Sequence, residues 1–383
     1  MTTLTITSEV FHWAKERAGL SDENLALNIH IKPEKIRAWE KGKEFPNFQQ
    51  AQKLASALSI PLGYLFLSHP PEISTPIADF RTLPDKTSTV LSSNLQDVLD
   101  DALRKRDWYN EWRKQETLTT FEFVGKYTIQ NKPADIIQDM RQVLDIPLNF
   151  TSRMTTWNEH LRAFIQKTET AGVLVLQSGI VGNNTRRKLS LEEFRGFTLA
   201  DQFAPLVFIN AQDTIAARIF TLAHELVHLW TGTSGISNPT LVPNVNEQAQ
   251  IEKFCNKVAA EFLAPRDTLK QQWNLSLTTL ENAQNLAQYF RVSAQVILRQ
   301  SFNLGIIQTS EYFKVYQDIL TAQRIPARGG GGNFYNSLLS RNSKRFTRTL
   351  ISALTSGQLS YLDAARLLNT QPRNIVKVID KLS

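Results

Sequence analysis

One segment, residues 215–230, constrains the fold more than any other part of the chain. It is apolar on almost every side of a predicted helix, yet it contains Arg218, His224, Glu225 and His228. Burying a polar side chain without a hydrogen-bond partner is costly, so each of these groups needs a partner or a function. We therefore expect a helix at the centre of a core, with a polar site on one face.

The spacing of these polar residues is that of a metal site. His224 and His228 lie four residues apart, so a helix brings both imidazoles to one face, where their nitrogens can bind one cation about 2.0 to 2.1 Å away. Glu225 projects beside them, where it can act on a water as a general base. The alternative is a pair of hydrogen-bonded histidines in a buried helix. The His-Glu-x-x-His pattern favours a zinc site.

A catalytic zinc site normally has three protein ligands, so the two histidines need a third. Every other histidine precedes this helix, so a downstream ligand should be a carboxylate or Cys255. The predicted helix over 246–263 contains three glutamates, and we choose Glu252, because small residues beside it allow the two helices to approach closely. Glu261 is the alternative carboxylate. Cys255 lies among apolar residues and is more typical of a small core side chain.

Length and composition limit the class of protein. The chain has 383 residues, of which 42% are hydrophobic and 21% charged, which predicts two or three folded domains rather than a disordered chain. No stretch of about 18 uncharged apolar residues occurs, and residues 1–19 carry several charges, so we expect neither a membrane span nor a secretory signal. A single cysteine favours a reducing, cytoplasmic location.

The expected fold is mainly α with a small β-sheet, that is, α+β. Short β-branched runs at 172–177 and 206–210 predict two strands, and 194–197 begins a third. These strands precede the apolar helix, and helices dominate the remainder of the chain. Composition shifts divide the chain into a helical module at 1–69, a Pro- and Ser-rich linker at 70–93, a domain at 94–328, and a glycine hinge with a helical segment at 329–383.

The first 69 residues predict five short helices, with a brief turn before Pro33. Within these helices and turns stand Leu25-Ala26, Ile36, Trp39-Glu40-Lys41-Gly42, Pro46, Leu54-Ala55 and Leu65-Phe66. In these residues the segment resembles the Xre, or lambda-repressor-like, helix-turn-helix.

The resemblance implies that the third helix binds DNA in the major groove. Lys35, Arg37, Lys41 and Lys43 would then contact bases or phosphates. The alternative is a helical bundle that binds a protein partner or forms a homodimer.

The apolar helix and its surroundings resemble the ImmA/IrrE family of metallo-endopeptidases. The resemblance rests on four blocks: Phe194-Arg-Gly-Phe197, Ala204-Pro205 with Ile209-Asn210, Phe220 to His228, and Glu252 to Pro265. It implies a zincin-like fold, Glu252 as third zinc ligand and a specific protein substrate such as a DNA-binding repressor.

The C-terminal segment holds most of the positive charge. Residues 324–383 contain ten Lys and Arg against two Asp, while the chain as a whole carries only +7. Residues 364–375 repeat the helix-turn-helix outline, and phosphate contacts are expected from the following side chains: Arg341, Lys344, Arg345, Arg348, Arg373 and Lys377. A solvated basic face, or a surface for an acidic protein, is the equally weighted alternative.

These observations predict a zinc endopeptidase fused to a DNA-binding module. It would regulate transcription, or a stress or mobile-element response, by cleaving a specific protein such as a repressor. The competing hypothesis is a DNA-binding repressor or antitoxin-like protein whose zinc site is structural or inactive. Glu225 favours the enzyme, because a structural zinc site needs no general base and is usually completed by Cys or His.

Overall fold

The computed structural model describes residues 5–71, 78–79, 91–237, 247–322 and 334–382. The chain forms two compact units, one containing residues 1–76 and 84–100 and the other containing 77–83 and 101–383. The architecture is mainly helical with a small mixed sheet, as predicted. None of the described helices combines the length and the hydropathy needed to cross a bilayer. The predicted glycine hinge at 329–332 lies outside the described residues.

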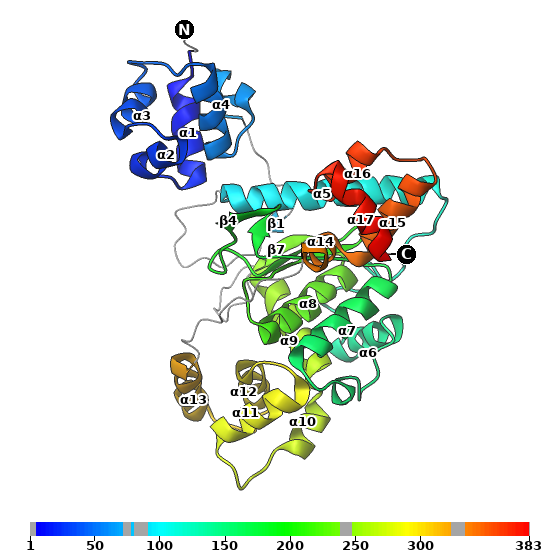
Figure 1. Cartoon of the computed structure of the whole chain (residues 1–383). Coiled ribbons are helices and arrows are strands. Elements are labelled where there is room, and N and C mark those ends of the chain that lie inside the picture. The colour runs from blue at the N-terminus through cyan, green and yellow to red at the C-terminus, as the bar shows by residue number, and fades with distance from the viewer. Residues whose placement is uncertain (1–4, 72–77, 80–90, 238–246, 323–333, 383) are drawn as a thin grey trace. The chain divides into compact units, whose positions relative to one another are not determined.

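The first unit contains the helix-turn-helix module (Figure 1). Its core consists of apolar side chains that include Leu25, Ile36 and Trp39. The fifth predicted helix is a short 3-10 helix. The elements are α1 (Ser8–Ala18), α2 (Asp22–Ile29), α3 (Pro33–Glu40), α4 (Phe48–Leu58) and η1 (Leu62–Phe66).

The turn between α2 and α3 is built by local hydrogen bonds. The Ser21 hydroxyl accepts a bond from the Asn24 amide at 3.2 Å and begins α2, while Pro33 stands in the first turn of α3. His30 adopts a left-handed backbone with φ of 59°, at a position where glycine is the commoner residue.

The second unit is built on a five-stranded sheet with strand order β1-β7-β5-β6-β2. The bounds are β1 (Ala78–Asp79), β2 (Leu174–Ser178), β5 (Gly196–Leu199), β6 (Leu206–Asn210) and β7 (Gly235–Ser237). Strand β5 runs antiparallel to both neighbours, whereas β2 pairs with β6, and β1 with β7, in parallel. Strand β1 comes from the segment expected to be a linker.

A hairpin and most of a long helix also belong to this unit. The hairpin pairs β3 (Ile180–Val181) with β4 (Asn184–Lys188) in antiparallel orientation. The long helix is α5 (Ser93–Gln115), and the division between the two units falls at residue 100 within it.

Helix α8 (Ile215–Trp230) packs between the sheet and other helices. It contacts β5 and β6 on one side and α9 (Glu247–Leu263) on another, and α7 (Trp157–Thr170) lies beside it (Figure 1). From Thr221 to Trp230 every residue is buried. A helix enclosed in this way explains why its sequence is apolar all round.

The remaining helices of this part extend the core around α9. Helix α6 (Pro133–Val143) packs on α9, and η2 (Thr151–Arg153) follows it along the chain. The chain then continues beyond α9 in four helices, of which α11, α12 and α13 pack together. These are α10 (Arg266–Gln272), α11 (Thr279–Phe290), α12 (Ala294–Asn303) and α13 (Thr309–Ala322).

The C-terminal segment forms four helices, the first two separated by a break at Ser343. Ser343 adopts φ of 63°, which ends one helix, and its hydroxyl accepts a bond from the Phe346 amide at 3.2 Å, which begins the next. The helices are α14 (Phe334–Asn342), α15 (Lys344–Thr355), α16 (Tyr361–Leu367) and α17 (Pro372–Leu382).

A buried carboxylate joins this segment to α7. Glu169, 7% exposed, accepts hydrogen bonds from the Ser343 hydroxyl at 2.6 Å and from the Lys344 amide at 2.9 Å. The Arg345 guanidinium donates to the Glu169 carbonyl at 2.9 Å and to the Tyr109 hydroxyl at 2.8 Å. An acceptor from a distant helix thus satisfies donors at the start of α15, where the positive end of the helix dipole also favours a negative charge.

We predict that Glu169→Ala lowers the free energy of unfolding by about 1 to 3 kcal/mol, because the buried Ser343 hydroxyl and the Lys344 amide lose their acceptor. Thermal unfolding and the protease sensitivity of α15 measure the effect. Glu169→Gln, which keeps an acceptor oxygen, should recover part of the loss. Glu122→Ala, at an exposed carboxylate, is the control. Equal stability of the Glu169→Ala and Glu122→Ala proteins would contradict this account.

Candidate functional site

The two histidines and Glu252 converge as the sequence predicts. The Nε2 atoms of His224 and His228 lie 3.1 Å apart, and each is near one oxygen of Glu252, at 3.2 Å for His224 and 3.0 Å for His228. One ligand atom from each residue falls within 4.8 Å of the others, and in the described part of the chain no further group of three such residues is found. Two imidazole nitrogens and a carboxylate oxygen form a donor set that suits zinc.

The ligands come from two packed helices. Both histidines belong to α8 and are at most 1% exposed, while Glu252 belongs to α9 and is 8% exposed. The close approach of α9 depends on residues such as Cys255 and Ala259, which are fully buried. Thr214 caps the start of α8, because its hydroxyl accepts a hydrogen bond from the Ala217 amide at 3.3 Å.

Polar side chains from the β7 region surround the ligands. The Nδ1 atom of His228 lies 2.8 Å from the Thr233 hydroxyl, which fixes the ring and leaves Nε2 facing Glu252. Ser237, fully buried at the end of β7, is 3.5 Å from both His228 Nε2 and Glu252 Oε1. The last residue of a strand therefore lies directly against two of the three candidate ligands.

Glu225 is held by strand β5 rather than by the ligands. The Thr198 hydroxyl donates to Glu225 Oε2 at 2.7 Å, and both residues are fully buried. The second oxygen, Oε1, has no hydrogen-bond partner in the described structure. A buried carboxylate with one oxygen fixed and the other unpaired is suited to accept a proton at Oε1.

Gly196 makes room for this carboxylate. A Cβ atom built at Gly196 would lie 2.8 Å from Glu225 Oε1, 2.7 Å from Thr221 Cγ2 and 3.0 Å from the Phe208 carbonyl. Any side chain here would displace the glutamate or the strand. The close contact gives a physical reason for the glycine of the Phe194-Arg-Gly-Phe197 block.

The ionisable groups of the site shift one another's pKa values. Burial raises the pKa of the Glu225 carboxyl, and the nearby imidazoles only partly offset it. Burial also acts to raise the pKa of Glu252, but His224 and His228 outweigh it and hold that pKa well below its usual range. The pKa of His224 is raised, because the attraction of Glu252 outweighs burial. The negative charge of Glu252 thus stabilises positive charge beside the imidazole nitrogens. A metal cation bound there would take the place of protons.

The other candidate ligands point elsewhere. Glu261 accepts hydrogen bonds from Gln300 at 2.8 Å and from the Arg266 side chain at 3.2 Å. Cys255 is fully buried, and burial raises the pKa of its thiol well above the usual value, which disfavours the thiolate that metals bind. Arg218, also on the apolar helix, donates to the Gln177 side chain.

Sequence reasoning missed Thr198, Thr233 and Ser237. Thr198 directly follows the Phe194-Arg-Gly-Phe197 block, which was the one available signal. Thr198 and Ser237 lie in strands and Thr233 in the loop before β7, places where these residue types are common. Their contacts with Glu225 and His228 come from segments distant in sequence or from a loop, so local spacing does not predict them.

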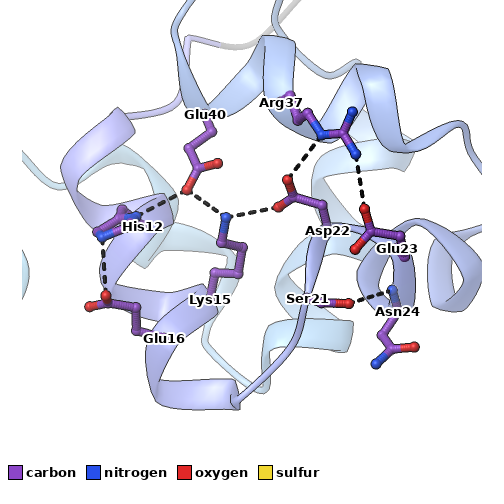
Figure 2. Close-up of polar contacts among 9 residues, drawn as sticks. All are labelled: His12, Lys15, Glu16, Ser21, Asp22, Glu23, Asn24, Arg37 and Glu40. Carbon is purple, nitrogen blue, oxygen red and sulfur yellow. Dashed lines mark hydrogen bonds and ion pairs between the residues drawn. The ribbon is translucent and has the colours of Figure 1, made fainter.

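In the helix-turn-helix module, the four predicted DNA-binding residues are exposed on or just after α3. Arg37, however, is held in ion pairs with Asp22 at 3.3 Å and Glu23 at 2.9 Å (Figure 2). These bonds raise the pKa of Arg37, Glu23 contributing most. No such pairing is found for Lys35, Lys41 and Lys43 among the described residues.

A charged network fixes α3 to α1. Lys15 donates to Asp22 at 2.8 Å and to Glu40 at 2.6 Å, and Glu40 also pairs with His12 at 3.0 Å (Figure 2). The hydrogen bond from Lys15 is the main reason that the pKa of Asp22 is lowered. The acidic residues beside the expected DNA face therefore have a structural role, which sequence alone did not reveal.

Three family models match separate parts of the chain. Residues 12–65 match the helix-turn-helix family, and residues 169–301 match the IrrE N-terminal-like domain of the M78 peptidases. Residues 342–381 match a domain of unknown function, DUF8813. Comparisons with curated proteins and with solved structures give no match. The chain therefore joins an Xre-like helix-turn-helix to an ImmA/IrrE-type domain, and the latter contains every residue of the candidate metal centre.

We predict that Gly196→Ala lowers the free energy of unfolding by about 1 to 3 kcal/mol, because the added methyl group collides with Glu225 and Thr221. Differential scanning calorimetry measures the change. Gly63→Ala is the matched control, since a Cβ there meets no atom within 4 Å. An unperturbed Gly196→Ala protein would show that the strand and the glutamate are not in close contact.

Glu23→Gln is expected to increase DNA affinity at low salt. The substitution removes a negative charge beside α3 and frees one end of Arg37, whereas Lys15 keeps its partners. Fluorescence anisotropy with a labelled duplex, over a salt series, measures the affinity. Glu44→Gln, an exposed carboxylate of the same module, is the control. Unchanged or weaker binding by the Glu23 variant alone would assign Arg37 a purely structural role.

Proposed function

We propose that this chain is a zinc-dependent endopeptidase that cleaves a specific protein, such as a repressor, and that its helix-turn-helix module binds DNA. The protein would thus regulate transcription, and it would act in the cytoplasm. One observation carries the proposal: three suitable ligand atoms meet beside a carboxylate whose Oε1 has no partner among the described residues.

His224, His228 and Glu252 would hold the zinc ion. When bound, zinc supplies Lewis acidity, which lowers the pKa of a water toward about 7 and polarises the scissile carbonyl. Thr233 orients His228 through Nδ1, so that Nε2 keeps its place in the ligand set.

Glu225 would move the proton. Thr198 holds Oε2, so Oε1 is the atom that takes a proton from the attacking water and later passes it to the leaving amine. Burial raises the pKa of this carboxyl, which makes its carboxylate a stronger proton acceptor. The donor set also favours catalysis over structure, since a structural zinc site is usually completed by a fourth Cys or His.

A second candidate function is supported by the burial of the site. Glu225 and the two histidines are at most 1% exposed, so a peptide has no direct route to them in this conformation. The second candidate is a DNA-binding regulator with a closed, non-catalytic zinc site. The two functions differ in whether Glu225 is needed for anything besides packing.

The test combines two substitutions in the full chain. Glu225→Gln should keep about one zinc per chain and lower cleavage by at least 10²-fold, because the general base is lost. Glu252→Ala should weaken or abolish zinc binding, because a ligand is lost. Elemental analysis measures zinc, and comparison of new protein N-termini in cells producing each form identifies cleavage. Glu261→Gln, which leaves the ligand set intact, is the control.

Each outcome separates the candidates. New N-termini with wild type and Glu261→Gln, but not with Glu225→Gln, support the peptidase. The same cleavage with Glu225→Gln would falsify the proposed role of this carboxylate. Zinc that depends on Glu252, with no cleavage by any form, would favour the closed regulatory site.

A further inference from the structure

The C-terminal helices α16 and α17 repeat the helix-turn-helix geometry of α2 and α3. Each pair begins with a serine cap, Ser21 or Ser360, and each second helix has a proline in its first turn twelve residues later, at Pro33 or Pro372. The turns are aligned as well. His30 with φ of 59° and Asn369 with φ of 50° stand at equivalent positions, nine residues after the cap.

The hydrogen bonds of the two turns correspond one to one. The Ile31 amide donates to the Ala26 carbonyl at 3.0 Å, and the Thr370 amide donates to the Ala365 carbonyl at 2.9 Å. The two serine hydroxyls accept amides at 3.2 and 3.1 Å. The cap and the turn of both pairs therefore make the same hydrogen bonds at the same positions.

The buried positions also correspond. The first helix of each pair buries adjacent small or aliphatic residues, and the second buries residues three and six positions after its proline. The matched pairs are Leu25 and Ala364, Ala26 and Ala365, Ile29 and Leu368, Ile36 and Ile375, and Trp39 and Val378. Helix α15 lies against α16 and supplies buried apolar residues to this core (Figure 1).

The exposed face of α17 differs from that of α3 in charge. Arg373 and Lys377 are exposed, lie four residues apart on one face, and make no ion pair among the described residues. The acidic residues of the first pair have no counterpart: Asp22, Glu23 and Glu34 correspond to Tyr361, Leu362 and Arg373. Within its bounds, α3 carries Lys35 and Arg37 against Glu34 and Glu40. Helix α17 carries Arg373, Lys377 and Lys381 against Asp380, so its net charge is the more positive of the two.

Neighbouring groups on α17 suit contact with a DNA duplex. Val376 is 53% exposed between the two basic residues, where it can contact a thymine methyl group. Lys381 continues the same stripe and lies 5.6 Å from the centre of the Tyr335 ring. Across residues 342–381 there are seven Lys and Arg against two Asp. The turn exposes α17 to solvent, and basic side chains on such an exposed helix can bind DNA phosphates.

We propose that α16 and α17 form a second helix-turn-helix that binds duplex DNA, with α17 in the major groove. Arg373 and Lys377 contact phosphates or base edges, and Val376 lies between them. Not all basic residues of the segment take part. Arg345 bonds to Tyr109 and Glu169, and Arg341 bonds to Gly182 and Asn183.

Two DNA-binding modules on one chain would make binding bivalent. Each module needs only modest affinity, since the second contact forms within a complex already held by the first. The protein would then favour DNA that carries two sites over DNA that carries one.

The test measures how DNA affinity of the full chain depends on salt. Arg373→Ala with Lys377→Ala should lower the slope of log Kobs against log salt by ~1.8, because each lost phosphate contact contributes about 0.9. The probe is a fluorescent 30-bp duplex of mixed sequence. The control removes two exposed lysines from other helices, Lys270→Ala with Lys314→Ala. The same two changes are also made in a Lys35→Ala, Arg37→Ala protein. If the second module binds independently, the slope should fall there by the same amount as in the otherwise unchanged chain.

The outcomes decide the role of α17. An unchanged slope in both backgrounds would overturn the proposal and leave this face for an acidic protein partner. An equal loss with a heparin fragment in place of the duplex would mean general polyanion binding and would also overturn it. Because both positions are exposed, thermal unfolding should not change; if it does, Arg373→Gln with Lys377→Gln repeats the measurement.

Discussion

The second unit depends on a polar contact inside its core. The buried imidazoles of His224 and His228 on α8 need polar partners, and the Glu252 carboxylate on α9 offers one oxygen to each of them. Their proximity brings α8 and α9 together and sets the register between the two helices. The sheet then covers the opposite side of α8, so the same contact organises both the core and the candidate metal centre.

Strand β5 connects the sheet to the chemistry. It crosses α8 at Glu225, where Gly196 leaves space and Thr198 supplies a hydrogen bond. Its antiparallel direction between β6 and β7 brings the end of β7, with Ser237, to the other side of the histidines. The glutamate and the candidate ligands thus contact different strands, Glu225 through Thr198 on β5 and His228 through Ser237 on β7.

Features that depend on local periodicity could be predicted from the sequence. Helix α8, its two histidines and the choice of Glu252 follow from 3.6-residue spacing, and the helix-turn-helix follows from caps and turn residues. Features that depend on pairing between distant segments could not. The strand order, the insertion of β1 from the expected linker, and the contacts of Thr198 and Ser237 belong to this class. The break between α14 and α15 at Ser343 could not be predicted either, because nothing in the sequence marks a serine that will adopt a positive φ.

The bond between Glu169 and the start of α15 has a consequence for synthesis. The carboxylate emerges from the ribosome 174 residues before the serine that binds it. Until then its oxygens must stay hydrated, so α7 and the strand that follows cannot close fully over them. A nascent or prematurely terminated chain would present this unsealed surface to chaperones and proteases. Cellular quality control would therefore distinguish finished molecules from unfinished ones by whether Glu169 is bonded to Ser343.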